Sequence, residues 1–279
     1  MFEIFLICLA GIWLAFATAC DFRKREIPDW LSFSLIAFAL AYRAFYSIFS
    51  WQDFFTPGII GLAIFFVIGE GIYRIGFGGG DAKILMALGT ILPFSLSFWI
   101  NAKLLATFFI SLFFIGAFYG LAFSIIITVR NSKKFVKQFR QEFLERKKLF
   151  ILSLVLAVFC LILSFFSIIF IAPAIFFMLM PAVFAYAKAL EEVMVKTLST
   201  SKLTLGDWLY ENVKVNGKVV RPSITGLDEK ELKILQRYKG KVKVKEGIPF
   251  TISFLIAFVF IVALWYSNWG FFNNNFWLF

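Results

Sequence analysis

Two aspartates, Asp21 and Asp81, stand at the ends of apolar segments and could perform chemistry at a membrane surface. A carboxylate inside a bilayer costs about 3 kcal/mol or more unless it is solvated or paired, so such acids are often functional. Two carboxyl groups at the same depth can share one proton, because the charge of one opposes ionisation of the other. One can then take a proton from an attacking water while the other donates a hydrogen bond to the scissile carbonyl. This hydrolysis requires no metal and no cofactor, and we expect neither.

Three consecutive glycines, Gly78, Gly79 and Gly80, precede Asp81. Glycine tolerates a positive φ and permits the close approach of another backbone, so we expect these residues to bind a substrate strand. The simpler alternative is a flexible turn in which Asp81 caps the helix that follows. The corresponding alternative for Asp21 is an interfacial acid that the neighbouring basic residues neutralise.

The elements that position these residues are apolar helices. The chain is 61% hydrophobic and 16% charged, which is more apolar side chain than a soluble protein of 279 residues could bury. A helix needs about 20 apolar residues to cross a bilayer. We find candidate runs at residues 2–20, 30–50, 57–75, 84–100, 104–129, 149–171, 173–189 and 249–269. They predict a membrane all-α fold, a polytopic bundle of about eight transmembrane helices. We expect six to eight helices, since Pro181 interrupts the seventh run.

The distribution of positive charge predicts the orientation of the chain. A net charge of +11 would indicate nucleic acid in a soluble protein, but the positive-inside rule explains it here, and we expect no nucleic-acid partner. With the N-terminus outside, every lysine and arginine except Lys103 and Arg43 falls in a cytosolic loop, and Arg43 is expected to snorkel outward. The chain is thus predicted to be a multi-pass protein of the cell membrane with both termini outside. Asp21 and Asp81 then lie near the cytosolic leaflet.

We expect five parts: a catalytic membrane core with both aspartates, a basic cytosolic segment, a transmembrane hairpin, a small cytosolic α+β module, and a final helix with an outer tail. Their ranges are 1–129, 130–148, 149–190, 191–247 and 248–279. In the basic segment, Phe135, Phe139 and Phe143 recur among basic residues. This pattern is typical of an amphipathic helix on an anionic cytosolic leaflet of the lipid bilayer. A cytosolic extension of the fifth helix is an equal alternative.

The module between the last two spans has its own secondary-structure signals. Apolar and charged residues alternate over 212–220 and 241–245, which predicts two short strands. The dipeptide Asn216-Gly217 predicts a turn. Residues 225–235 predict a helix with an acidic start.

The two acidic motifs together resemble the type IV prepilin peptidase family of GxGD aspartic proteases, particularly its archaeal preflagellin and prepilin branch. In that branch an Asp followed by a basic stretch and an Ile-Pro turn ends the first helix, and GxGD opens the fourth. The matching residues here are 21–30, DFRKREIPDW, and 78–81, GGGD. The resemblance implies that Asp21 and Asp81 are the catalytic pair. The cytosolic cysteine pairs of the bacterial branch are absent, so neither zinc nor N-methyltransferase activity is expected.

The same resemblance implies the substrates. They are membrane-bound precursors with class III leader peptides, either type IV pilin-like or archaellin-like, from which a short basic leader is removed at the cytosolic membrane face. Glu70 is a candidate for binding the basic residues before the cleavage site. More often, an acid at such a position satisfies a neighbouring helix or Arg74.

Two other classes of membrane protein could use the same acids. A presenilin or signal-peptide-peptidase type of protease is disfavoured, because that family places its acids on consecutive helices, whereas two predicted spans separate Asp21 from Asp81. A proton- or cation-coupled transporter is the main alternative, but no second copy of either acidic motif indicates an internal repeat. A simple anchor for the polar module would not need so many spans.

Overall fold

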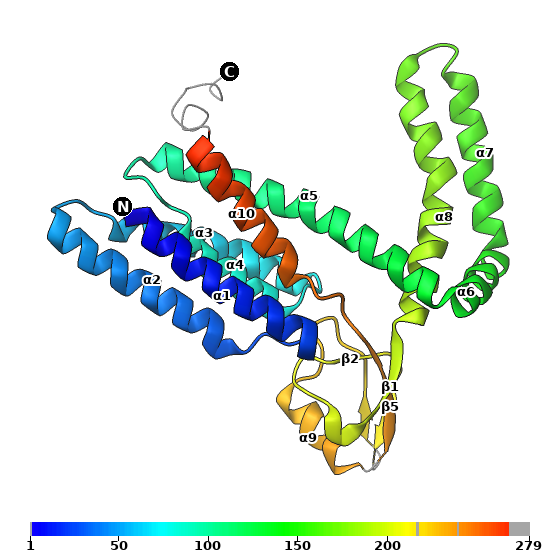
Figure 1. Cartoon of the computed structure of the whole chain (residues 1–279). Helices are drawn as coiled ribbons and strands as arrows, with labels where there is room; N and C mark the ends of the chain where they lie inside the picture. The colour runs from blue at the N-terminus through cyan, green and yellow to red at the C-terminus, as the bar shows by residue number, and fades with distance from the viewer. Residues whose placement is uncertain (1, 216–217, 239, 268–279) are drawn as a thin grey trace. The chain divides into compact units, whose positions relative to one another are not determined.

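The computed structural model describes residues 2–215, 218–238 and 240–267, and the chain forms two compact units (Figure 1). The first unit is Met1–Leu121 with Leu198–Phe279, and the second unit is Ala122–Thr197. Helix α5 (Phe98–Arg130) begins in the first unit and ends in the second.

The membrane part of the first unit also contains α1 (Phe2–Lys24), α2 (Asp29–Ser50), α3 (Phe55–Arg74), α4 (Gly79–Ile91) and α10 (Thr251–Ser267). Within the described residues, five helices are long and apolar enough to cross a bilayer: α1, α2, α3, α5 and the helix over Ile168–Val193. Helix α10 is apolar but shorter. The prediction of a mostly helical, multi-pass membrane protein is therefore confirmed, whereas the predicted count of eight spans is not.

Helix α4 is a short central helix rather than a full span. Its 13 residues rise about 20 Å, less than the roughly 30 Å of a bilayer core. Leu85, Leu88 and Ile91 are completely buried, so apolar residues on α4 pack against protein. The predicted run over 84–100 was wrong about where this helix ends: α4 ends at Ile91, shortly before Pro93, and α5 begins at Phe98. A proline disfavours the helical conformation of the residue before it, and helices often end there.

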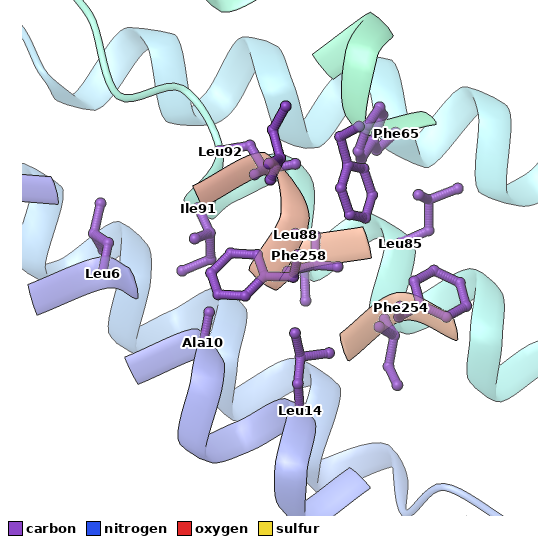
Figure 2. Packing of buried hydrophobic residues seen from close by; sticks show 14 of the residues in the cluster. Leu6, Ala10, Leu14, Phe65, Leu85, Leu88, Ile91, Leu92, Phe254 and Phe258 are labelled. Carbon is purple, nitrogen blue, oxygen red and sulfur yellow. The ribbon is translucent and has the colours of Figure 1, made fainter. Parts of the chain in front are cut away.

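The core of the first unit lies where α1, α4 and α10 meet. Figure 2 shows Leu14 of α1, Leu88 of α4 and Phe258 of α10 pointing toward one another. All three belong to one buried apolar cluster. Helix α10 therefore packs with α1 and α4, although about 160 residues of chain separate it from α4. Residues of its first turn can contribute to a site built by α1 and α4.

Helices α3 and α4 approach each other backbone to backbone. A Cβ atom added at Gly61 would lie 2.1 Å from the carbonyl oxygen of Gly89, and one added at Gly89 would lie 2.4 Å from that of Gly61. Small residues at helix interfaces permit such contact in membranes, where the hydrophobic effect does not drive helices together. The position of α4, which carries Asp81, is thus fixed by α3.

Arg43 of α2 corrects the expectation that its side chain snorkels outward, because it is completely buried. Helix α4 ends inside the protein and leaves carbonyl oxygens that need donors. The guanidinium supplies them: Nε donates to Thr90 (2.6 Å), and Nη2 donates to Ile91 (3.1 Å) and Pro93 (2.6 Å). Nη1 donates to the Phe54 carbonyl at 2.8 Å. A cation at a helix C-terminus also complements the helix dipole.

The predicted small module with strands is present near the C-terminus. Strands β2 (Trp208–Leu209) and β5 (Lys241–Lys245) pair antiparallel in a sheet of order β1-β5-β2, with β1 at Val195–Ser199. Strands β3 (Val213–Val215) and β4 (Lys218–Val220) form a separate antiparallel pair, and the turn predicted at Asn216-Gly217 lies outside the described residues. Helix α9 (Glu229–Arg237) lies between β4 and β5 and begins with a capping box formed by Asp228 and Glu231. A short 3-10 turn, η2 (Thr200–Lys202), follows β1.

The second unit contains α6 (Ser132–Glu145), α7 (Lys147–Leu163), the 3-10 turn η1 (Ile168–Phe170) and α8 (Ile171–Val193). Helix α6 is separate from α5 and amphipathic, so it is not a simple extension of α5. Its Phe135 is buried against the ring of Tyr186 in α8, with the ring centroids 5.3 Å apart. Helices α7 and α8 form an apolar hairpin in which α8 continues through Pro181. Contact of α6 with an anionic leaflet stays a prediction.

Candidate active site

Asp21 lies in the last turn of α1 and is 7% exposed. Its Oδ2 atom accepts a hydrogen bond from the backbone N–H of Thr251, at 3.0 Å. Thr251 is the first residue of α10, and the first N–H groups of a helix have no partner within the helix. The N-terminal end of a helix also carries partial positive charge. The start of α10 therefore holds the Asp21 carboxyl group in place.

Asp81 is in the first turn of α4 and is partly exposed. It lies close enough to Asp21 for the two carboxyl groups to interact electrostatically. The fold thus brings together the two acids that the sequence places far apart. Each comes from the cytosolic end predicted for its helix.

The glycines before Asp81 have packing roles in the structure. A Cβ atom at Gly78 would lie 3.1 Å from Oδ2 of Asp81, so glycine leaves space for the carboxyl group. A Cβ atom at Gly80 would lie 3.0 Å from the side chain of Ile27. The loop that follows Asp21 is therefore packed against the turn that carries Asp81. Contact of these glycines with a substrate stays a prediction.

The same two loops are linked by charge. Lys83 of α4 forms an ion pair with Asp29 at the start of α2. Arg25, whose φ of 59° ends α1 in a left-handed conformation, lies 4.0 Å from the carboxylate of Glu246. Glu246 stands in the segment between β5 and α10, so this pair links the ends of α1 and of the module.

Tyr119 of α5 is a further neighbour of Asp21. Its hydroxyl oxygen is buried, and it is close enough to interact electrostatically with both Asp21 and Arg25. The sequence did not single out Tyr119, because it is one aromatic residue within a long apolar run. Thr251 was also missed, since the group that it contributes is a backbone N–H, which no residue type reveals.

Glu70 is not part of this cluster as the structure describes it. Its Oε1 atom accepts a hydrogen bond from Nε of Arg74 at 2.8 Å, one helical turn later on α3. This pair is the alternative that the sequence favoured for Glu70. Binding of a basic leader by Glu70 stays a prediction.

The module lies beside the loops that carry the aspartates. A Cβ atom at Gly76, which has a φ of +101°, would lie 3.0 Å from the side chain of Ile224. Burial raises the pKa of the Asp207 carboxyl group, and the negative charge of the nearby Glu26 raises that pKa further. A hydrogen bond from the backbone N–H of Thr204 acts in the opposite direction. The segment 223–226 and Asp207 thus belong to the surroundings of the site.

The side chains of this cluster are suited to acid and base chemistry. Across the described part of the chain, no group of three or more His, Cys, Asp or Glu residues is arranged to hold a metal ion. Two interacting carboxyl groups, one bound by an N–H donor, can hold and transfer a proton and can activate a water molecule.

Comparisons with known proteins match the part of the chain that contains both aspartates. Residues 8–125 match the type IV leader peptidase family. The chain is 30% identical to the preflagellin peptidase of Methanocaldococcus jannaschii over 137 residues, which cover 46% of this chain and 58% of that protein. It is 32% identical to the preflagellin peptidase of Methanococcus maripaludis over 132 residues, which cover 44% of this chain and 57% of that protein. No solved structure matches significantly.

The chain thus spans less than two thirds of the length of these relatives. The matched residues 8–125 contain both aspartates and the glycines before Asp81, whereas most of the second unit and all of the module lie outside them. The resemblance drawn from the two acidic motifs is confirmed, since residues 8–125 match the type IV leader peptidase family.

Proposed function

We propose that this protein is an intramembrane aspartic endopeptidase that removes the leader peptide from type IV pilin-like or archaellin-like precursors. Asp21 and Asp81 are its catalytic pair. The observation that carries the proposal is that these two carboxyl groups, from different helices of the region matched to leader peptidases, lie close enough to interact electrostatically.

The reaction uses a water molecule and no other reactant. The ionised carboxylate takes a proton from the water as its oxygen bonds to the scissile carbonyl carbon. The protonated carboxyl donates a hydrogen bond to the carbonyl oxygen. The carbon–nitrogen bond then breaks, and the departing amine receives a proton from the pair. Because like charges oppose each other, the pair holds one proton at the start, as this sequence of steps requires.

The orientation of the chain supports cleavage at the cytosolic membrane face. In this proposal both termini are outside, and the basic loops and the module are in the cytosol. Single cysteines test it: a cysteine replacing Lys214 is expected to react with an impermeant reagent only in inverted vesicles or opened cells. Reaction from the outer side of intact cells would contradict this orientation.

Coexpression with a precursor that carries a class III leader tests the activity. Asp21→Asn and Asp81→Asn should each lower the rate of processing at least about 100-fold, because each removes a proton-transferring group. The measurement is the mobility shift of the precursor on a gel. Asp53→Asn is the matched control, since Asp53 is an exposed aspartate in the loop between α2 and α3. Processing that survives in either Asp21→Asn or Asp81→Asn would remove that residue from the pair.

A further inference from the structure

We propose that the first turn of α10 is a third component of this active site: the Thr251 N–H positions Asp21 as the ionised base, which leaves Asp81 as the protonated acid. The inference rests on the proposed peptidase function and deepens it. It assigns different tasks to two aspartates that the sequence motifs treat alike.

The hydrogen bonding of the two carboxyl groups is unequal. Asp21 accepts the Thr251 N–H at 3.0 Å, whereas the Asp81 carboxyl accepts no hydrogen bond from any residue that the structure describes. Both groups lie near a helix N-terminus, Asp21 at that of α10 and Asp81 at that of α4, so the helix dipoles favour negative charge at each. The direct donor is what distinguishes them. A donor aimed at a carboxyl oxygen favours its ionised form.

Other charged or titratable groups also lie near Asp21. Asp81 of α4 and Tyr119 of α5 interact with it electrostatically. Arg25 of α1 is cationic, and its Nε atom lies 4.0 Å from Oε1 of Glu246 in the segment before α10. The Thr251 N–H donates directly to the Asp21 carboxyl group.

The hydroxyl group of Thr251 must be considered separately from its N–H. Its hydroxyl oxygen is completely buried and has no hydrogen-bond partner among the described residues. A buried polar group without a partner is disfavoured, so few are retained in folded proteins. Because Thr251 is completely buried, we assign it the role of a positioning residue, which acts on Asp21 through its N–H.

The pH dependence of kcat/KM for a leader-bearing precursor tests this assignment. Thr251→Pro removes the N–H at the first residue of a helix, where proline is well tolerated. The base should then hold its proton to higher pH, so the acid limb of the profile should move up by about one pH unit. A shift of the basic limb instead would make Asp21 the acid, and an unchanged profile would show that Thr251 does not act on Asp21. Either result overturns the proposal.

Two further variants separate this effect from simple damage. Thr251→Val keeps the N–H and removes the hydroxyl, so its acid limb should stay in place. If Thr251→Val moves the limb as far as Thr251→Pro, the hydroxyl is responsible and the proposal fails. Glu229→Pro makes the same change at the first residue of α9 and should leave the profile unaltered. Loss of activity in Asp21→Asn and Asp81→Asn with no limb shift in Thr251→Pro would refute only this inference, not the peptidase function.

Discussion

Helix α4 of the first unit and helix α7 of the second are both apolar, yet they are buried to opposite extents. Leu85, Leu88 and Ile91 of α4 are 0% exposed, whereas Leu152, Val155 and Ile162 of α7 are 56%, 58% and 56% exposed. Hydropathy therefore shows that a segment belongs in a membrane but not whether it faces protein or lipid. The difference comes from the neighbours that each helix finds.

In the first unit, α4 is contacted both by a neighbouring helix backbone and by a buried side chain. Glycines let α3 contact α4 at the backbone, and Arg43 binds the carbonyl oxygens at the end of α4. The hairpin of the second unit has few such contacts, among them a bond from the Ser153 hydroxyl to the Phe177 carbonyl. Helices in lipid are held together by close packing and hydrogen bonds. Substitutions should therefore cost much more stability in the first unit than in the second.

The largest effect is expected for Arg43→Leu. This change leaves several buried carbonyl oxygens without a donor, each at a cost of about 1–3 kcal/mol, so the free energy of unfolding should fall by at least about 3 kcal/mol. Thermal unfolding in detergent measures the loss. The peptidase activity should fall with it, because α4 carries Asp81.

Arg74→Leu is the matched control for Arg43→Leu. Arg74 is on α3, its side chain is 75% exposed, and its partner is Glu70 on the same helix. An exposed ion pair of this kind contributes about 0–1 kcal/mol. If Arg74→Leu lowered the free energy of unfolding as much as Arg43→Leu, the claim that the buried hydrogen bonds of Arg43 stabilise the first unit more than an exposed ion pair does would be refuted.

The sequence predicted these features to different degrees. Long apolar runs located α1, α2 and α3 within a few residues, because such runs have one stable arrangement in lipid. The end of α4 and the burial of Arg43 could not be read from hydropathy, since the partners of Arg43 at the end of α4 lie about fifty residues away along the chain. The motifs named Asp21 and Asp81. Nothing in the motifs revealed that the start of α10 reaches Asp21, because that contact is made by a backbone group.

A smaller loss is expected for Gly89→Ala. The added Cβ would lie 2.4 Å from the carbonyl oxygen of Gly61 and 2.8 Å from its carbonyl carbon. Helices α3 and α4 must separate to accept it, and overpacking of this kind costs about 1–3 kcal/mol. Thermal unfolding in detergent again gives the value. Gly11→Ala in α1 is the control: nothing lies within 4 Å of its added Cβ, so a loss as large as that in Gly89→Ala would contradict the packing argument.

The smallest effect is expected for Tyr186→Phe in the second unit. Its hydroxyl lies 3.0 Å from Ser124 and 3.3 Å from Thr128, while its ring contact with Phe135 would remain. Hydrogen bonds between membrane helices average about 0.6 kcal/mol, so unfolding in detergent should shift only slightly. Tyr266→Phe, at an exposed position of α10, should give no shift. A loss above about 2 kcal/mol in Tyr186→Phe would place it in the range expected for the first unit, and the contrast between the two units would then not hold.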